Sequence, residues 1–568
     1  MKFIRIGLLI VLSLGLFLRL FGYNWDQGSH LHPDERFLTM VGVDTKLPRT
    51  FSGYMNPKTS SFNPANKGFT FYVYGTLPVL MNKILGELWY SDTYEAFHLQ
   101  GRILSGLADL CIILLIYKIC ELLEKKLKFN PSIKLFAAFF YAIAVLPIQL
   151  SHFFTVDTFL NLFCWSSLYF IIKLIVEKGR NFIVYMSLSG LFLGLSFACK
   201  ISALYFAPLI GVFVLMAIQN AIHTNRGNGF RAWLAIFMGM VGFILFSYFA
   251  LRLGSPYYFE TGAILDPRIS FKFINNILEL KSFDNPLGYF PPSIQWVSKQ
   301  PVFQLINIFY FGIGPFYSLF SMVGVVYLFF RKKDSVMTIS AIWIVLFVAF
   351  QSFQFAKTMR YLIFIYPFLA LFAAIGLERT LFAIRHIKYP TIICIHVLIC
   401  LNILIWPLAF FSIYTKDHSR VEASMWIYEH IPSKSILLSE YWDDPLPIPI
   451  GNIIYKKYRN LEVHVFDPDT KEKWEVINAQ LNEADYYIMS SNRGWGSIPT
   501  VSKRYPMTTK FYEDMFKGRI NYTLVKEFSS YPSLRYLGIP LDFPDQWAEE
   551  AFTVYDHPLV KIFKKNTK

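Results

Sequence analysis

The sequence predicts a polytopic α-helical membrane protein with a small α/β domain at its C-terminal end. Two observations predict the membrane part. The 568 residues are 54% hydrophobic with a mean hydropathy of +0.39, and apolar runs long enough to cross a bilayer recur along the chain. A third observation predicts the terminal domain, because beyond residue 413 the apolar runs shorten to strand length and charged residues return.

The membrane part contains about 11 predicted spans, each near the ~20 residues that cross the hydrocarbon core. The first span follows Lys2 and Arg5 as a signal peptide would, but no small-residue cleavage site comes after it, so we expect it to be retained. The third span is the weakest, because Pro147 interrupts it. The predicted spans are 4–22, 101–122, 135–150, 155–176, 181–198, 202–222, 232–252, 303–330, 336–354, 361–377 and 391–413.

Short basic loops set the predicted orientation in the cell membrane. The net charge of +15 would suit nucleic-acid binding, but the basic residues gather between apolar runs, which is the positive-inside pattern. We therefore expect no nucleic-acid partner, a cytoplasmic N-terminus and an extracytoplasmic C-terminal domain. The cytoplasmic loops would be 124–134, 177–180, 223–231, 331–334 and 378–388.

Three larger segments would then lie outside. The first is loop 23–100, in which the amphipathic stretch 77–89 suits the membrane interface. The second is loop 253–302, which is rich in Pro, Tyr and Phe. The third is a separate domain, 414–568, following the membrane module 1–413. This domain has no Gly-rich phosphate fingerprint, and its helical and strand patterns alternate, which predicts a partly parallel sheet. The predicted elements are a helix at 421–430 and strands at 435–438, 461–466, 486–489 and 524–528.

The most informative motif is His32-Pro33-Asp34-Glu35-Arg36, directly after the first span. It places two adjacent carboxylates at the membrane boundary, where ionisable groups are expensive to hold and usually functional. Pro33 also suits the first position of a helix, with Asp34 and Glu35 in the favourable first turn. A plain helix start is therefore the alternative interpretation.

Other polar residues also interrupt the spans at the predicted outer face. His152 and Asp157 occupy a tight turn, Lys200 separates the fifth and sixth spans, and Arg360 with Tyr361 opens the tenth. Cations are scarce on the outer side, so topology does not explain Lys200 and Arg360. The alternative for each is a snorkelling side chain at a helix end.

Together these groups would surround one external cavity and suit the transfer of a group away from a phosphate. Cations stabilise the charge that develops on the leaving phosphate, and a carboxylate deprotonates the attacking hydroxyl. Glycoside hydrolysis differs, because a second carboxyl must protonate its leaving oxygen. A zinc site from His30, His32 and His152 is a weaker alternative, so no metal site is predicted. A divalent cation held by the carboxylates stays open as a cofactor.

The Asp-Glu motif after the first span resembles that of polyprenyl-phosphate-sugar-dependent glycosyltransferases of the GT-C fold. The most similar groups are the bacterial protein O-mannosyltransferase-like and aminoarabinose-transferase-like enzymes of glycosyltransferase family 39. The resemblance extends over most of the chain. Its further motifs are 151–157, 194–203, 360–368, 426–432 and 441–445.

The resemblance implies an inverting glycosyltransferase in which Asp34 is the general base and Glu35 supports it or orients the acceptor. It implies that the lipid-linked phosphate is held by Arg36, Lys200, Arg360 and Tyr361, and that Asp157 occupies the region of a second external acidic motif. His152 is a further candidate site residue. The lectin insertion of eukaryotic protein mannosyltransferases is absent, which puts a protein acceptor in doubt. A lipid or glycan acceptor is equally open, and Trp442, Asp443 and Asp444 are candidate acceptor contacts if the C-terminal domain does more than stabilise the outer face.

Two other classes of function compete with the enzyme. A multi-span transporter or lipid flippase would share the span count and the intramembrane charges, but the sequence shows no internal repeat and its charges gather at one face. A structural or receptor protein would leave the Asp34, Lys200 and Arg360 set unexplained. The preferred prediction is transfer of a sugar from a polyprenyl-phosphate donor to an acceptor hydroxyl at the external leaflet.

Overall fold

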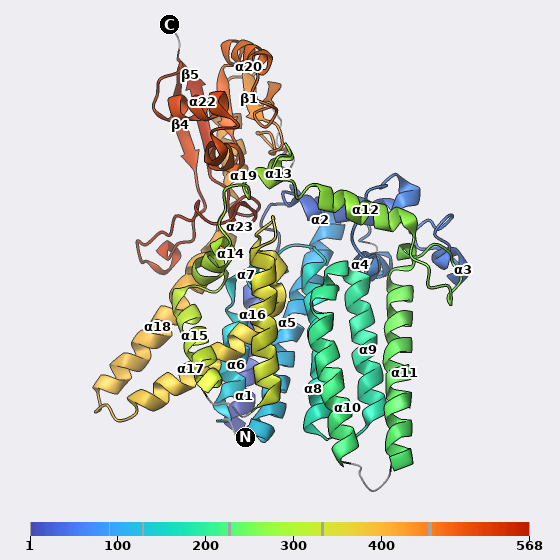
Figure 1. Ribbon diagram of the computed structural model, residues 1–568. Coiled ribbons are helices and arrows are strands. Elements are labelled where there is room, and N and C mark those ends of the chain that lie inside the picture. The colour runs from blue at the N-terminus through green and yellow to red at the C-terminus, as the bar shows by residue number, and fades with distance from the viewer. Residues whose placement is uncertain are drawn as a thin grey trace.

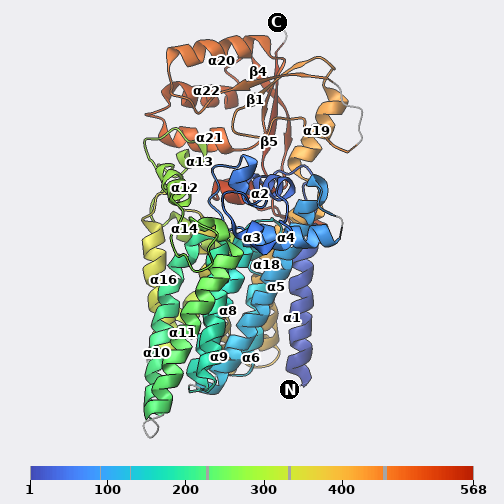
Figure 2. The same cartoon turned by 90° about the vertical axis from the view of Figure 1, so that its right-hand side faces the viewer.

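The computed structural model describes residues 2–89, 91–127, 130–178, 180–224, 229–330, 334–451 and 457–566. It consists of a bundle of long helices and, beyond one end of the bundle, a β-sheet flanked by helices (Figure 1). The N-terminus lies at the end of the bundle remote from the sheet, and shorter helices occupy the layer between bundle and sheet (Figure 2). The chain is thus a polytopic helical membrane protein with a small sheet-containing unit.

Within the described ranges, eight helices are long and apolar enough to cross a membrane, or ten if each of two bent pairs counts as one span. A shorter apolar helix, Ala207–His223, supplies the remaining predicted span. The bundle helices are α1 (Lys2–Leu20), α5 (Tyr94–Leu127), α6 (Ser132–Ala142), α7 (Val145–Ser151), α8 (Asp157–Val176), α9 (Phe182–Cys199), α10 (Ala207–Thr224), α11 (Gly229–Gly254), α15 (Pro315–Phe330), α16 (Ser335–Ser352), α17 (Tyr366–Ile384) and α18 (Thr391–Phe411).

Two predicted spans are bent rather than straight. In the third, α6 and α7 meet at 55°. Pro147 lies in the first turn of α7, where backbone N–H groups have no partner within the helix, so its lack of an N–H costs no hydrogen bond. In the eighth, α14 (Phe303–Asn307) and the π-turn η4 (Ile308–Gly312) meet α15 at 115°. The left-handed φ of +84° at Gly314 and the following Pro315 explain this break.

Glycines allow α9 and α11 to pack closely. Gly190 and Gly194 lie one turn apart on α9, and a Cβ on either would collide with backbone atoms of Phe243 or Ser247 on α11. Small residues are the usual contact in a bilayer, because lipid gives helices no hydrophobic reason to associate. This contact fixes the end of α9, where Lys200 follows.

The layer between bundle and sheet comes mainly from the two long loops, 23–100 and 253–302. Its helices include the predicted helix start, since Pro33 is the first residue of α2, and the predicted amphipathic stretch, which forms α4. These elements are α2 (Pro33–Asp44), α3 (Phe51–Met55), η1 (Pro64–Lys67), α4 (Leu77–Leu88), η3 (Pro256–Tyr258), α12 (Phe271–Ser282) and α13 (Pro291–Ile294).

The sheet has five strands in the order β2-β1-β3-β5-β4. β1 runs parallel to β2 and β3, whereas β5 is antiparallel to β3 and β4, so the predicted partly parallel sheet is confirmed. The fifth strand was not predicted. The strands are β1 (Ile436–Glu440), β2 (Arg459–Val463), β3 (Tyr486–Met489), β4 (Tyr522–Phe528) and β5 (Val560–Lys565), and the helices are α19 (Ser419–His430), α20 (Lys471–Glu483), α21 (Arg493–Ser497), α22 (Pro506–Phe516) and α23 (Glu550–Thr553).

The two faces of the sheet belong to different hydrophobic cores. Leu438 and Tyr487 pack in a core with α20 and α22, whereas Leu437 and Ile488 point the other way, toward α19. The core on the α19 side is continuous with the core of the membrane bundle. The sheet is therefore anchored on the bundle through buried apolar contacts.

Candidate active site

The first turn of α2 brings Asp34 to the ends of other helices. His32 caps the helix, since its ring Nδ1 accepts the N–H of Glu35 at 3.3 Å. The Asp34 carboxylate accepts a bond from the Arg360 guanidinium at 2.6 Å. Burial is the largest single effect and would raise the pKa of Asp34, but the charge and hydrogen bond of Arg360, together with His32 and Lys200, outweigh it and lower this pKa to about 2. Asp34 is therefore held as an anion.

A second ion pair lies beside the first and shares Arg360 with it. Lys200 Nζ donates to Asp157 Oδ1 at 2.9 Å, and Arg360 Nε lies 3.8 Å from Asp157 Oδ2. Lys200 also lies over the Tyr361 ring, 5.8 Å from its centroid. We call Asp34, Arg360, Asp157 and Lys200 the charge network. It contains two carboxylates and two cations, so it is neutral overall when all four are charged.

Each member of the charge network lies at the end of an element. Asp157 is the first residue of α8, Lys200 is the extended residue that follows α9, and Arg360 lies at the start of the 3-10 helix η5 (Met359–Ile365). Side chains at such ends are held by the bundle yet lie where the apolar spans stop. Asp157 is nearly buried, whereas the side chains of Asp34 and Arg360 are 29% and 22% exposed. A ligand can therefore reach Asp34 and Arg360.

Glu549, from the sheet-containing unit, fixes the start of η5. Its carboxylate accepts the Thr358 hydroxyl at 2.8 Å and the Met359 N–H at 2.7 Å, directly before Arg360. Burial raises the pKa of Glu549 to about 7. No sequence pattern distinguished this residue, because it lies far along the chain and in no motif.

Glu35 lies on the other side of α2 from the charge network. Its carboxylate accepts two bonds from Arg102, at 2.5 and 2.9 Å, and one from the Phe154 N–H at 2.6 Å. Arg102 also forms two bonds of 2.9 Å with Asp26, and all three charged side chains are completely buried. Consecutive helical residues point about 100° apart, which separates Glu35 from Asp34. The structure thus does not bring Glu35 to the network.

Arg36 also points away from the charge network, toward the sheet-containing unit. Its guanidinium donates to Asp444 at 3.0 Å, and Arg420 binds both Asp443 and Asp444. Asp443 and Asp444 are therefore occupied by cations of the protein, while Trp442 remains 43% exposed. Arg36 joins the two parts of the molecule.

The predicted histidines are packing residues in this structure. His152 is buried, with its ring nitrogens 2.8 and 2.9 Å from the carbonyl oxygens of Ile148 and Phe21, and it stacks on Tyr414. His30 packs on His98, and His32 caps α2, so His30, His32 and His152 do not form a zinc site. Among all described residues, no group of three His, Cys, Asp or Glu side chains is arranged to hold a metal ion.

The importance of Arg102 was not predicted, although its position in the sequence indicates it. An arginine inside an apolar span needs a buried partner or a functional role. Arg102 begins the second predicted span, and Asp26 lies just after the first, so their pairing joins the two spans. Tyr74 was also overlooked. Burial and the charge of Asp34 raise the pKa of Tyr74 well above its usual value.

Residues 97–249 match the family model described as dolichyl-phosphate-mannose-protein mannosyltransferase. Among solved structures, the archaeal oligosaccharyltransferase AglB from Archaeoglobus fulgidus, in complex with an inhibitory peptide and a dolichol-phosphate, is 13% identical with a TM-score of 0.50, covering 99% of this chain and 88% of AglB. ArnT from Cupriavidus metallidurans bound to undecaprenyl phosphate is 12% identical with a TM-score of 0.42, covering 99% and 97%. The comparison with curated proteins gives no match. The likeness to AglB shows that the chain has the GT-C fold.

Proposed function

We propose that this protein is an integral-membrane glycosyltransferase that moves a sugar from a polyprenyl-phosphate donor to an acceptor hydroxyl, with inversion at the anomeric carbon. The observation that carries the proposal is the charge network. It places two cations beside two carboxylates, partly exposed, where the apolar spans end. The matches to a mannosyltransferase family model and to an oligosaccharyltransferase fold support a glycosyltransferase and give no support to a transporter or flippase.

In this mechanism the acceptor oxygen attacks the anomeric carbon and gives its proton to Asp34. The bond between that carbon and the phosphate oxygen breaks, and the phosphate leaves with the electron pair, stabilised by Arg360 and Lys200. Tyr361 would flank the phosphate, because its ring lies under Lys200. Asp157 would hold Lys200 in place.

The pairing of Asp34 with Arg360 explains how the base would be activated. A carboxylate with a pKa of about 2 accepts a proton poorly, since a general base works best with a pKa nearer the operating pH. A phosphate that binds Arg360 would weaken its bond to Asp34, and the pKa of Asp34 would rise. Donor binding would thus prepare the base for the acceptor.

Glu35 and Arg36 would support this site from outside it. Glu35 anchors the first turn of α2 to Arg102, so it would position Asp34 without touching the substrates. Arg36 would connect α2 to Asp444. The positive-inside loops favour a cytoplasmic N-terminus, and with that orientation the charge network and the sheet-containing unit would lie at the extracytoplasmic face of the cell membrane.

The test is transfer from radiolabelled polyprenyl-phosphate sugars to extracted cell envelope by purified wild type and Asp34→Asn. We expect label transfer by wild type and at least a 100-fold loss in Asp34→Asn. Asp44→Asn, at the exposed end of the same helix, is the matched control and should keep full activity. Substantial transfer by a folded Asp34→Asn protein would refute the base assignment. Absence of transfer from every donor by folded wild type would contradict the glycosyltransferase.

A further inference from the structure

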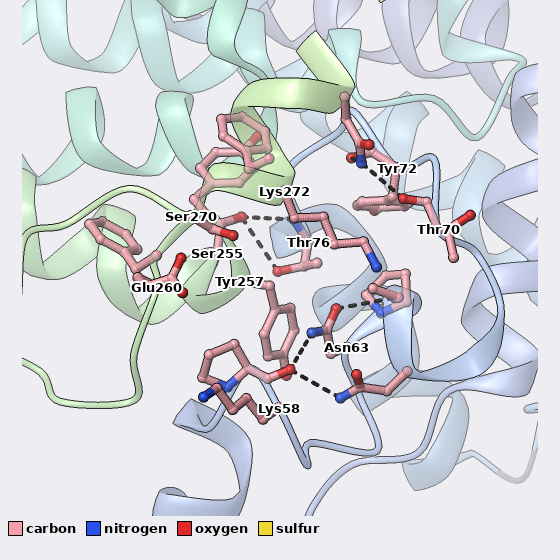
Figure 3. Close-up of a pocket in the computed structure, with 18 of the residues that line it drawn as sticks. Lys58, Asn63, Thr70, Tyr72, Thr76, Ser255, Tyr257, Glu260, Ser270 and Lys272 are labelled. Atoms are coloured by element: carbon pink, nitrogen blue, oxygen red, sulfur yellow. Dashed lines mark hydrogen bonds between the residues drawn. The ribbon is translucent and has the colours of Figure 1, made fainter. Parts of the chain in front are cut away.

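A cavity of about 250 Å³ lies between the two long loops, beside the end of the bundle (Figure 3). Residues 57–76 of the first loop form one wall, and residues 255–276 of the second form the other. Asp34 belongs to the first of these loops, but no residue of the charge network lines the cavity. The cavity is large enough for one monosaccharide-sized group.

The walls combine aromatic rings with amides and hydroxyls. Tyr72, Tyr258 and Phe273 contribute rings, and Tyr258 stacks on Phe273 with 3.9 Å between centroids. Asn63 and Ser270 contribute polar groups (Figure 3). An apolar surface with a few placed polar groups is typical of small-molecule sites, and a sugar ring offers apolar C–H faces and hydroxyls that match both.

Two cations lie at the rim of the cavity. Lys58 and Lys272 line it from opposite loops, and both residues are exposed (Figure 3). Glu260 lines it as well and is also exposed, so the rim carries one net positive charge from these three groups. Such a rim favours a ligand with an anionic substituent.

The hydroxyl of Tyr258 has no hydrogen-bond partner among the described residues, although Tyr258 is only 7% exposed. Buried polar groups are nearly always paired, and an unpaired one is destabilising. Tyr258 lines the cavity, but its hydroxyl oxygen is closed to solvent, so a ligand hydroxyl would pair with it only after a small shift of the side chain. Whether a ligand forms that bond is what the Tyr258→Phe variant below tests.

The segment 72–76 connects the cavity to the charge network. The Gly75 N–H donates to the Cys199 carbonyl at 2.8 Å, and Cys199 directly precedes Lys200. On the other side, the Ser255 hydroxyl donates to the Ala198 carbonyl at 2.8 Å and accepts the Thr76 N–H at 2.7 Å. Tyr74 lines the cavity and lies in the field of Asp34. The cavity therefore adjoins the network.

We propose that this cavity binds the acceptor, and that the acceptor is a sugar ring carrying an anionic group such as a phosphate or carboxylate. This inference rests on the proposed glycosyltransferase, whose base Asp34 would meet the acceptor hydroxyl at the Tyr74 side of the cavity. The donor phosphate has its own cations in Lys200 and Arg360. Lys58 and Lys272 are separate from them and serve the acceptor.

Binding is measured first, by saturation-transfer NMR on the full-length protein in lipid nanodiscs. The probes are mannose 6-phosphate, glucuronic acid and methyl α-mannoside. We expect wild type to bind the two anionic sugars more tightly than the neutral one. Lys272→Ala should remove this preference while leaving binding of methyl α-mannoside unchanged.

Tyr258→Phe is the sharpest variant, because it deletes only the unpaired hydroxyl. A purely structural tyrosine would lose nothing, and the melting temperature should stay the same or rise. We expect sugar binding to weaken about fivefold, the usual effect of one lost hydrogen bond. Tyr248→Phe is the matched control: its hydroxyl donates to the Ile264 carbonyl at 2.8 Å, outside the cavity lining, so it should lose stability but no sugar binding.

Transfer kinetics then distinguish this proposal from the proposed function. Tyr258→Phe should raise KM for the acceptor about fivefold and leave KM for the donor unchanged. Three results would overturn the acceptor site. The variant could raise KM for the donor instead of the acceptor, peptides could compete where sugars do not, or wild type could bind no sugar. If wild type and Asp34→Asn bind the sugars but wild type transfers none, the cavity proposal stands and the transferase fails. If transfer occurs and Tyr258→Phe matches wild type, the transferase proposal stands and the cavity proposal fails.

Discussion

Replacing Arg102 with leucine tests whether Glu35 is a structural anion rather than a catalytic one. Arg102 donates four bonds to Asp26 and Glu35 and one to the Tyr23 carbonyl, and the three charged side chains are fully buried. Leucine would leave two buried carboxylates with no cation. Breaking a buried ion pair by removing one partner destabilises a protein by about 3–5 kcal/mol.

Glu35→Gln should destabilise the protein less than Arg102→Leu does. The Arg102–Asp26 pair survives, and the glutamine carbonyl can still accept bonds from Arg102. Burial already raises the pKa of Glu35, so losing its charge also removes a desolvation penalty. The expected loss is about 1–3 kcal/mol, the range for a weakened buried hydrogen bond to a charged group.

The assay is thermal unfolding of the purified proteins in one detergent, followed by intrinsic fluorescence. Arg102→Leu should unfold at the lowest temperature, Glu35→Gln next and wild type last. The double variant should lose less than the sum of the two single losses, because the residues are in direct contact. An Arg102→Leu protein as stable as wild type would refute the buried cluster.

The same variants separate stability from catalysis. At a temperature where Glu35→Gln is folded, we expect it to keep a larger fraction of transfer than Asp34→Asn, which should keep at most about one hundredth. If folded Glu35→Gln loses as much activity as Asp34→Asn, Glu35 contacts the reacting groups. The position of Glu35 away from the charge network would then not be its position during catalysis.

Three further predictions concern the charge network and the sheet-containing unit. Arg360→Ala and Lys200→Ala should each lower kcat/KM by about 10²–10³-fold in the transfer assay, because each removes charge stabilisation from the leaving phosphate. Glu549→Ala should lower kcat at least tenfold by releasing η5, whereas Glu550→Gln, in the next position, should not; both are measured at saturating donor. Burial raises the pKa of Glu440 from 4.5 to about 7, so its contribution to stability is complete below pH 4.5 and is lost as the pH rises through 7. The shift is worth roughly 3 kcal/mol, and Glu440→Gln should flatten the fall in melting temperature between pH 5 and 8.

Each of these predictions has a clear contrary result. Full activity in Lys200→Ala would remove that cation from phosphate binding. Equal kcat in wild type and Glu549→Ala would mean that η5 holds Arg360 without the sheet-containing unit. A pH profile of melting that is the same with and without Glu440 would place the titrating group elsewhere, and Glu549, whose pKa is also raised to about 7, would be tested next.

Hydropathy and periodicity predicted most of the helices and four of the strands, because local sequence decides whether a segment is apolar and how its polar residues alternate. The bends at the third and eighth spans depend on how the pieces pack, which no window of sequence contains. β5 was overlooked because its apolar residues lie among lysines, and they become buried only when the strand pairs with β3 and β4 and its two faces join the two hydrophobic cores.

The site was predicted in part. Asp34, Asp157, Lys200 and Arg360 were noticed because each interrupts an apolar pattern, and the structure brings them together across 326 positions of sequence. The side of α2 on which Glu35 lies follows from helical periodicity and could have been predicted. Glu549 could not, because its role depends on where the sheet-containing unit sits on the bundle.

The position of β5 in the sheet has a consequence for biosynthesis. It is the last strand in chain order, yet it lies between β3 and β4, so the sheet cannot close until residue 565 has left the ribosome. Domains usually fold as units during synthesis, N-terminal parts first. Here the contact of Glu549 with η5 waits for the same late event. A growing chain that already has all its membrane spans would still be catalytically immature, and the site would mature only after β5 has emerged and paired.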